Sequence, residues 1–165
     1  MNDIIDQFID YVRQDNQESR DSINLNELIE DVVQARNIEE HHHIETGLDP
    51  LPIMQIRRIA IKRALDNLIE NAFRYGSDNI LILSGSDKKK KTVFFSVRDY
   101  GKGIPNEQIE NLFQPFTQGD KARGSVGSGL GLAIIKRIVG LHEGVIELHN
   151  HADGGLVATV TLPVK

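Results

Sequence analysis

The amino-acid sequence predicts an α+β fold, a two-layer sandwich in which a mixed, mostly antiparallel sheet of about five strands is covered on one face by about three helices. Two observations carry this prediction. Several segments repeat apolar residues at helical spacing, and short apolar runs bounded by glycine, asparagine, aspartate or proline lie between and after them. Because most of these runs are neighbours along the chain, hairpins and an antiparallel sheet are favoured over a parallel one.

The first apolar period covers residues 4–12 and gives way to a polar stretch, 14–22. This change indicates the end of a helix followed by a linker. A second helix opens after Asn24 and Asn26, either of which is a suitable N-terminal cap. The helices expected beyond the linker are 26–36, a strongly amphipathic one from Ile61 to Phe73 that ends at Gly76, a short one at 106–112, and an apolar one at 130–141.

Five runs have the length and composition of strands. The first follows the chain-breaking segment Asp49-Pro50-Leu51-Pro52. The last two flank Asp153-Gly154-Gly155, a good hairpin turn. The predicted strands are 53–57, 79–84, 92–98, 145–149 and 156–162, and residues 113–128 are expected to form a long irregular loop.

Composition limits the kind of protein. A chain of 165 residues with 39% hydrophobic and 26% charged residues fits one globular domain with a sizeable core. Its net charge is −5, and the only basic cluster is 88–91, so nucleic acid is not the favoured partner. We expect a soluble, cytoplasmic domain without direct membrane contact, because long apolar runs, a signal-peptide pattern and cysteines are all lacking.

Three polar features interrupt the apolar elements. The first is Asn67 and Asn71, one helical turn apart and therefore on the same side of a helix. An amide oxygen is a neutral hard ligand suited to Mg²⁺, which takes few protein ligands and completes its shell with water and phosphates. The pair also fits two solvated asparagines on a helix surface.

The second feature is Asp99-Tyr100-Gly101-Lys102-Gly103, directly after a strand. A carboxylate at a strand end can accept a hydrogen bond from an exocyclic amine such as that of adenine, and the glycines allow a flat ring to approach the backbone. The same pattern also describes an ordinary turn.

The third feature is the glycine-rich stretch Gly127-Ser128-Gly129-Leu130-Gly131-Leu132, which runs into an apolar helix. Free backbone N–H groups and the positive end of the helix make such a junction suitable for phosphate. It lacks the Gly-Lys-Ser/Thr ending of a P-loop, and it does not follow a strand as a dinucleotide fingerprint does. A flexible hinge is the alternative.

Together, these features resemble the N, G1 and G2 boxes of the family that unites histidine kinases, gyrase-type ATPases, the ninety-kilodalton heat-shock chaperone and mismatch-repair ATPases, whose fold is the Bergerat fold. Between the last two boxes, Phe113-Gln114-Pro115-Phe116 resembles the F box of the kinases. The resemblance runs over nearly the whole chain and is closest to osmosensing kinases of the EnvZ type, through stretches such as Asn71-Ala72-Phe73-Arg74-Tyr75-Gly76 and Leu112-Phe113-Gln114-Pro115-Phe116.

The resemblance implies roles for individual residues. Asn71 would ligate Mg²⁺, Asp99 would bind the adenine amine, Tyr75 would line the base pocket, and Arg74 would lie near the phosphates and act with Asn71 in catalysis. Residues 117–126 would form an ATP lid, in which Lys121 or Arg123 would contact phosphate. The further nucleotide contacts implied are Asn67, Gly101, Gly103, Ile104, Phe113, Phe116, Gly127, Gly129, Leu130, Gly131 and Leu132.

The resemblance also favours phosphotransfer over hydrolysis. Hydrolytic relatives carry a glutamate one turn before the metal asparagine, and Asn67 occupies that position here. An amide does not act as a general base near neutral pH, although Glu70 is a nearby carboxylate. The expected activity is that of a protein-histidine kinase using Mg-ATP; a self-contained ATPase coupled to conformational change and a non-catalytic nucleotide-binding module are the alternatives.

The phosphate acceptor is expected elsewhere. The family's acceptor lies in a His-Glu/Asp-x-Arg-x-Pro setting, which none of the six histidines matches. The cluster 41–43 fits solvated loop histidines or a metal site. By resemblance, 1–13 would end a dimerisation and phosphoacceptor helix, 14–22 would be the linker, and 23–165 would be the ATP-binding domain. The implied partners are that acceptor domain and a response regulator, with the domain forming the cytoplasmic part of an inner-membrane sensor kinase.

Overall fold

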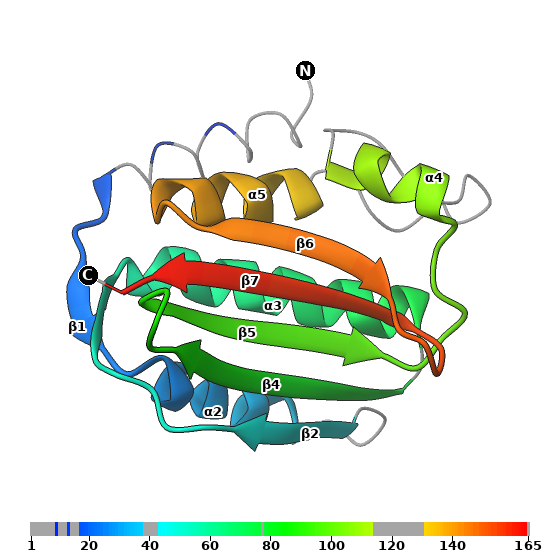
Figure 1. Ribbon diagram of the computed structural model, residues 1–165, viewed down its shortest axis with the longest axis horizontal. Coiled ribbons are helices and arrows are strands. Elements are labelled where there is room, and N and C mark those ends of the chain that lie inside the picture. Colours follow the sequence, from blue (N-terminus) through cyan, green and yellow to red (C-terminus); the bar gives the residue numbers. More distant parts are fainter. Residues whose placement is uncertain are drawn as a thin grey trace.

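The fold is a five-stranded sheet with three helices packed on one face (Figure 1). This computed structural model describes residues 9, 13, 17–37, 43–76, 78–113 and 131–164. The sheet order is β2-β4-β5-β7-β6, and the helices on its inner face are α2, α3 and α5. The predicted α+β sandwich is confirmed.

The sheet comprises β2 (His43–Leu48), β4 (Asn79–Asp87), β5 (Thr92–Asp99), β6 (Val145–Asn150) and β7 (Leu156–Pro163). The helices are α2 (Leu25–Arg36), α3 (Arg58–Tyr75), α4 (Asn106–Ile109), α5 (Gly131–Leu141) and the 3-10 turn η1 (Glu110–Phe113).

The three covering helices follow the predicted apolar periods. The Asn24 side chain accepts a hydrogen bond from Asn26 N at 2.9 Å, so Asn24 is the cap of α2. The helix α3 ends at Gly76, as predicted, with the Gly76 N–H bonded to Ala72 O at 3.0 Å. The residues that α5 buries lie at helical spacing: Ala133, Ile134, Ile135, Ile138 and Val139.

The inner face of the sheet supplies the other half of the core. Alternate residues of β5 point to this face, and Val93, Phe95 and Val97 are all buried there. All neighbouring strands are antiparallel except β2 and β4, which are parallel because α3 crosses over between them. The sheet is therefore mixed, as expected. The register of β5 with β4 and β7 determines which residues lie beside Asp99 at the edge of the sheet.

Two strands differ from the sequence prediction. The strand β2 was not predicted, because Ile44 is its only fully buried residue and its other side chains are exposed or half-exposed. The strand β1 (Asp21–Ile23) pairs with β3 (Met54–Ile56) in a separate two-stranded sheet. Asp21 and Ser22 fall in the stretch interpreted as a linker, so the end of that stretch joins the folded domain.

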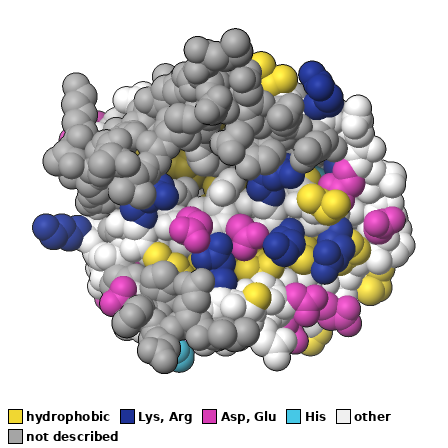
Figure 2. Space-filling view, turned by 180° about the vertical axis from the view of Figure 1, so that it is seen from behind, with side chains coloured by type: hydrophobic (Ala, Val, Ile, Leu, Met, Phe, Trp, Pro, Cys, Tyr) yellow, Lys and Arg dark blue, Asp and Glu magenta, His cyan; other side chains and the backbone are white. Residues whose placement is uncertain are grey.

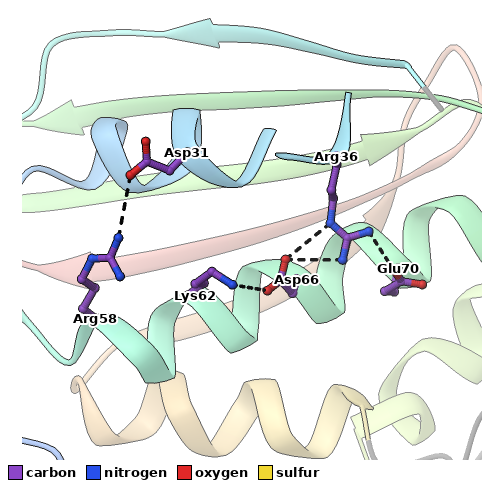
Figure 3. Close-up of polar contacts among 6 residues, drawn as sticks. All are labelled: Asp31, Arg36, Arg58, Lys62, Asp66 and Glu70. Atoms are coloured by element: carbon purple, nitrogen blue, oxygen red, sulfur yellow. Dashed lines mark hydrogen bonds and ion pairs between the residues drawn. The ribbon is translucent and has the colours of Figure 1, made fainter. Parts of the chain in front are cut away.

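Ion pairs hold α2 against α3 on the helical side of the molecule. The Arg36 guanidinium contacts Glu70 Oε1 at 2.7 Å and Asp66 Oδ1 at 3.4 Å, and Lys62 also reaches Asp66 (Figure 3). Seen from behind, acidic and basic side chains are interspersed over this side (Figure 2). Such surface pairs contribute little each, so buried apolar area carries most of the stability of the α2–α3 contact, and the ions mainly fix its geometry. No helix among the residues placed by the structure is long and apolar enough to cross a membrane.

Candidate functional site

The helix α3 brings the predicted metal asparagine to the start of α5. A Cβ atom built on Gly131, the first residue of α5, would lie 3.8 Å from Asn71 Nδ2 and 4.0 Å from Asn71 Oδ1. Asn71 is half-buried, and so is Asn67 one turn earlier, whereas Arg74 is exposed. The structure therefore joins the first and third polar features of the sequence, although Asn71 and Gly131 lie far apart along the chain.

The helix start at Gly131 suits a phosphate. The first N–H groups of a helix have no partner within the helix, and the aligned peptide dipoles make this end positive. Gly131 and Leu132 are half-buried, so the α5 terminus retains access to solvent. An anion bound there would lie beside the Asn71 amide, whose oxygen is a suitable ligand to hold Mg²⁺.

Asp99 occupies the end of β5 and is 3% exposed. Its Oδ1 accepts hydrogen bonds from Gly101 N at 2.9 Å and from Leu156 N at 3.2 Å. Within the described part of the chain, the hydrogen bonds to this carboxylate all end on Oδ1, which leaves Oδ2 for another donor. A buried carboxylate with one oriented oxygen and one available acceptor matches the predicted role toward an exocyclic amine.

The loop after β5 contains a glycine in the left-handed region and is hydrogen-bonded to the end of β6. Gly103 has a φ of 77°, in the left-handed region that favours glycine. Ile104 N donates to Asn150 Oδ1 at 2.9 Å, and α4 begins two residues later. Tyr100 is 45% exposed, with the Arg98 guanidinium 4.4 Å from its ring centroid, so this side chain faces outward from the core.

Several predicted positions lie outside what the structure describes. These are the lid 117–126 with Lys121 and Arg123, and the residues Phe116, Gly127, Gly129 and Leu130. Tyr75 ends α3 and Phe113 ends η1, but their side chains are also outside the described part. The roles assigned to these residues remain predictions.

The predicted metal site rests on Asn71. Among the residues described, no group of three or more His, Cys, Asp or Glu side chains could hold a metal ion. A neutral amide beside a helix terminus fits Mg²⁺ bound through phosphates and water better than an all-protein cage. His43, at the end of the histidine cluster, begins β2 and is exposed; His41 and His42 fall in a gap of the described chain.

Sequence reasoning missed three residues that shape the site. Gly76 and Gly155 both pack against Asp99, and Asn150 holds the loop that follows it. The sequence indicated Gly76 only as a helix end and Gly155 only as part of a turn, because the contact with Asp99 comes from another part of the chain. Asn150 directly follows the predicted strand 145–149, where an asparagine is also typical of a turn.

His142 is a buried histidine in another part of the fold. It follows the C-terminal end of α5 and is 2% exposed. Its Nδ1 donates to Ile138 O at 2.8 Å and its Nε2 accepts from Arg57 N at 3.0 Å. Because Nε2 accepts from a backbone N–H, the ring is neutral, and burial also lowers the pKa of His142.

Comparisons with known proteins agree with this architecture. Residues 56–165 match the family described as histidine kinase-, DNA gyrase B- and HSP90-like ATPase. The chain is 38% identical over 121 residues to the alginate biosynthesis sensor protein KinB of Pseudomonas aeruginosa, covering 73% of this chain and 20% of KinB. The histidine kinase domain of the E. coli osmosensor EnvZ has 39% identity and a TM-score of 0.70, over 90% of this chain and 91% of that structure. Full-length ShkA in complex with AMPPNP shares the fold, with a TM-score of 0.77 at 24% identity over 90% of this chain and 32% of ShkA.

The chain therefore belongs to the family of histidine kinase-, DNA gyrase B- and HSP90-like ATPases. Within that family it is the catalytic, ATP-binding domain of a sensor histidine kinase, and the predicted resemblance to the EnvZ type is confirmed. It spans only a fifth of the length of KinB.

Proposed function

We propose that this domain binds Mg-ATP and transfers the γ-phosphate to a histidine on a separate phosphoacceptor domain of the same kinase. The observation that carries this proposal is the approach of Asn71 to Gly131, with Asp99 at the end of the neighbouring strand β5. The adenine amine would donate to Asp99, and the phosphates would lie at the α5 terminus. ShkA, which shares the fold, holds the ATP analogue AMPPNP.

The domain's own residues would act by positioning and by neutralising charge. The α5 terminus offers N–H donors and a positive dipole, and Arg74, which is exposed two residues before Gly76, would turn toward a phosphate. Asn71 Oδ1 would hold Mg²⁺, which supplies charge neutralisation at the phosphates when bound. Phosphoryl transfer needs little more from the protein than this, because the attacking imidazole comes from the acceptor domain.

Two residues favour transfer over hydrolysis. Asn67 stands one turn before Asn71, where an amide does not activate water. Glu70, the nearest carboxylate in the sequence, is engaged by Arg36 at 2.7 Å on the side of α3 that faces α2 (Figure 3). This ion pair engages the Glu70 carboxylate with α2 and makes it less available to activate a water at the predicted phosphate site.

The setting of the domain is part of the proposal. The relatives are sensor kinases, and the part they share with this chain is the catalytic one. We infer a cytoplasmic domain of a kinase held in the inner membrane, with the phosphate passing from the acceptor histidine to a response regulator.

Phosphotransfer tests the proposal directly. The domain is incubated with γ-labelled ATP, Mg²⁺ and a separately produced phosphoacceptor domain of the same kinase, and label on that domain is measured. A labelled acceptor with little free phosphate is the expected result. Rapid phosphate release without acceptor would favour the ATPase alternative, and tight ATP binding with neither product would favour a regulatory module.

A further inference from the structure

Asn150, the last residue of β6, is bound through its side chain to the loop that follows Asp99. Its Oδ1 accepts from Ile104 N at 2.9 Å, and its Nδ2 donates to Ile104 O at 2.7 Å. The same Nδ2 also donates to Asn106 Oδ1 at 3.1 Å, at the start of α4. The side chain thus satisfies both backbone groups of one loop residue.

This pairing extends the sheet edge by one residue. A carboxamide carries the same donor and acceptor as a peptide group, so Asn150 imitates a strand partner for Ile104. The loop approaches it closely at the preceding residue, since a Cβ atom built on Gly103 would collide with Asn150 Oδ1. Glycine is favoured at position 103 by its φ of 77°, and it also lets the Asn150 side chain approach without moving aside.

The hairpin between β6 and β7 also holds the other end of the loop. Leu156 N donates to Asp99 Oδ1 at 3.2 Å, and a Cβ atom on Gly155 would collide with the Asp99 backbone carbonyl. Residues 150–156 therefore contact the segment 99–104 at both of its ends. That segment contains Asp99 and the glycines predicted to contact the base.

We propose that Asn150 is a positioning residue for recognition of the nucleotide base, acting through Ile104 on the loop 99–104. This inference rests on the proposed function, because it assumes that the base binds at Asp99. Among the described residues, the hydrogen bonds of the Asn150 side chain go to this loop and to the start of α4. Its hydrogen bonds to Ile104 are exposed, so water replaces them when the side chain is removed, and the loop loses its fixed path at little cost to folding.

The test compares Asn150→Ala with His149→Ala, a control at an exposed neighbour on the same strand. Calorimetric titration with a non-hydrolysable ATP analogue and Mg²⁺ should show about tenfold weaker binding for Asn150→Ala, which corresponds to a loss of about 1.4 kcal/mol. His149→Ala should bind like the parent. The melting temperatures of both variants should stay close to that of the parent. Asn150→Asp keeps the acceptor for Ile104 N but sets a carboxylate against Ile104 O and Asn106 Oδ1, and should bind more weakly still.

A double-mutant cycle with Asp99→Asn separates positioning from a general effect. If Asn150 acts through the loop that holds Asp99, its removal in the Asp99→Asn background should weaken binding by clearly less than tenfold. Parent-like affinity of Asn150→Ala, or strictly additive losses in the cycle, would overturn the inference while leaving the proposed function standing. Failure of the parent itself to bind adenine nucleotide would instead overturn the proposed function, and the inference with it.

Discussion

Gly76 lies directly against Asp99: a Cβ atom built on Gly76 would come within 2.5 Å of Asp99 Cγ. Gly76 ends α3 and Asp99 ends β5, so the contact joins the helix that carries Asn71 to the strand that carries the predicted base acceptor. A built Cβ would also come within 2.7 Å of Ala72 O, so close packing from two sides requires glycine here.

Gly76→Ala should therefore damage both stability and nucleotide binding. The added methyl group has to displace Asp99 or the end of α3, which we expect to cost about 1–3 kcal/mol of unfolding free energy. Thermal or urea unfolding measures the loss of stability, and titration with an ATP analogue measures the loss of affinity. The matched control is Gly140→Ala, because a Cβ atom at Gly140 meets no atom within 4 Å and alanine favours the helix interior, so this variant should be as stable as the parent or more so.

Asp99→Asn should weaken adenine nucleotide binding while leaving the loop in place. The amide oxygen of the introduced side chain can still accept from Gly101 N and Leu156 N, but an NH₂ group then replaces the available acceptor Oδ2. Loss of a hydrogen bond to a charged group costs about 1.5–3 kcal/mol. The dissociation constant measured by calorimetry should rise roughly tenfold to a hundredfold, and unchanged affinity would remove Asp99 from the site.

Asn71→Asp should act mainly through magnesium. The substitution puts a charged oxygen beside the α5 terminus at Gly131, where the phosphates are expected to bind, and so changes both ion affinity and local repulsion. We expect the Mg²⁺ dependence of ATP binding and of phosphotransfer to shift, with the smaller shift in Asn67→Asp, because Asn71 is the residue within 4 Å of the built Gly131 Cβ. A magnesium titration of Asn71→Asp that overlays the parent's would contradict the assignment.

Glu18 caps α3 from outside the helix. The N-cap residue Arg57 makes no side-chain capping bond; instead, Glu18 Oε2 accepts from Ile59 N at 2.7 Å and Oε1 accepts from Ala60 N at 3.0 Å. A missing cap costs about 0.5–2 kcal/mol, so Glu18→Ala should lower the urea midpoint by a corresponding amount with an unchanged m-value. Ser19→Ala, at the exposed next residue, should unfold like the parent.

His142 should make stability fall as the pH drops below about 6.5. Burial lowers its pKa in the folded state from 6.5, so below that pH the unfolded chain binds the proton more readily than the folded one. This contribution to stability is complete above pH 6.5 and is lost as the pH falls toward the folded-state pKa, by at most about 1.4 kcal/mol per pH unit. His142→Gln removes the titrating ring, and its stability should vary less as the pH falls below 6.5; identical slopes for parent and variant would contradict this account.

The predicted elements were the ones whose signal is local. The apolar stripe of α3 and the hairpin of β4 and β5 recur at fixed spacing along the sequence, so their existence and their ends were predicted to within a few residues. The strand β2 buries only Ile44 fully and is held by pairing with β4, on the far side of α3 in the chain. The strand β1 has only three residues and pairs with β3. Neither β1 nor β2 therefore had a local sequence pattern that could reveal it.

By itself, the sequence determined the class of protein and its candidate nucleotide residues, because helical spacing, a strand-end carboxylate and a glycine-rich helix start are properties of neighbouring residues. Only the tertiary structure decided which of these groups meet and what supports them. Asn71 reaches Gly131, Gly76 leaves room for Asp99, and Asn150 holds Ile104 because distant segments pack around one core. A contact between distant segments depends on how the whole chain closes, and neither partner's local sequence encodes that.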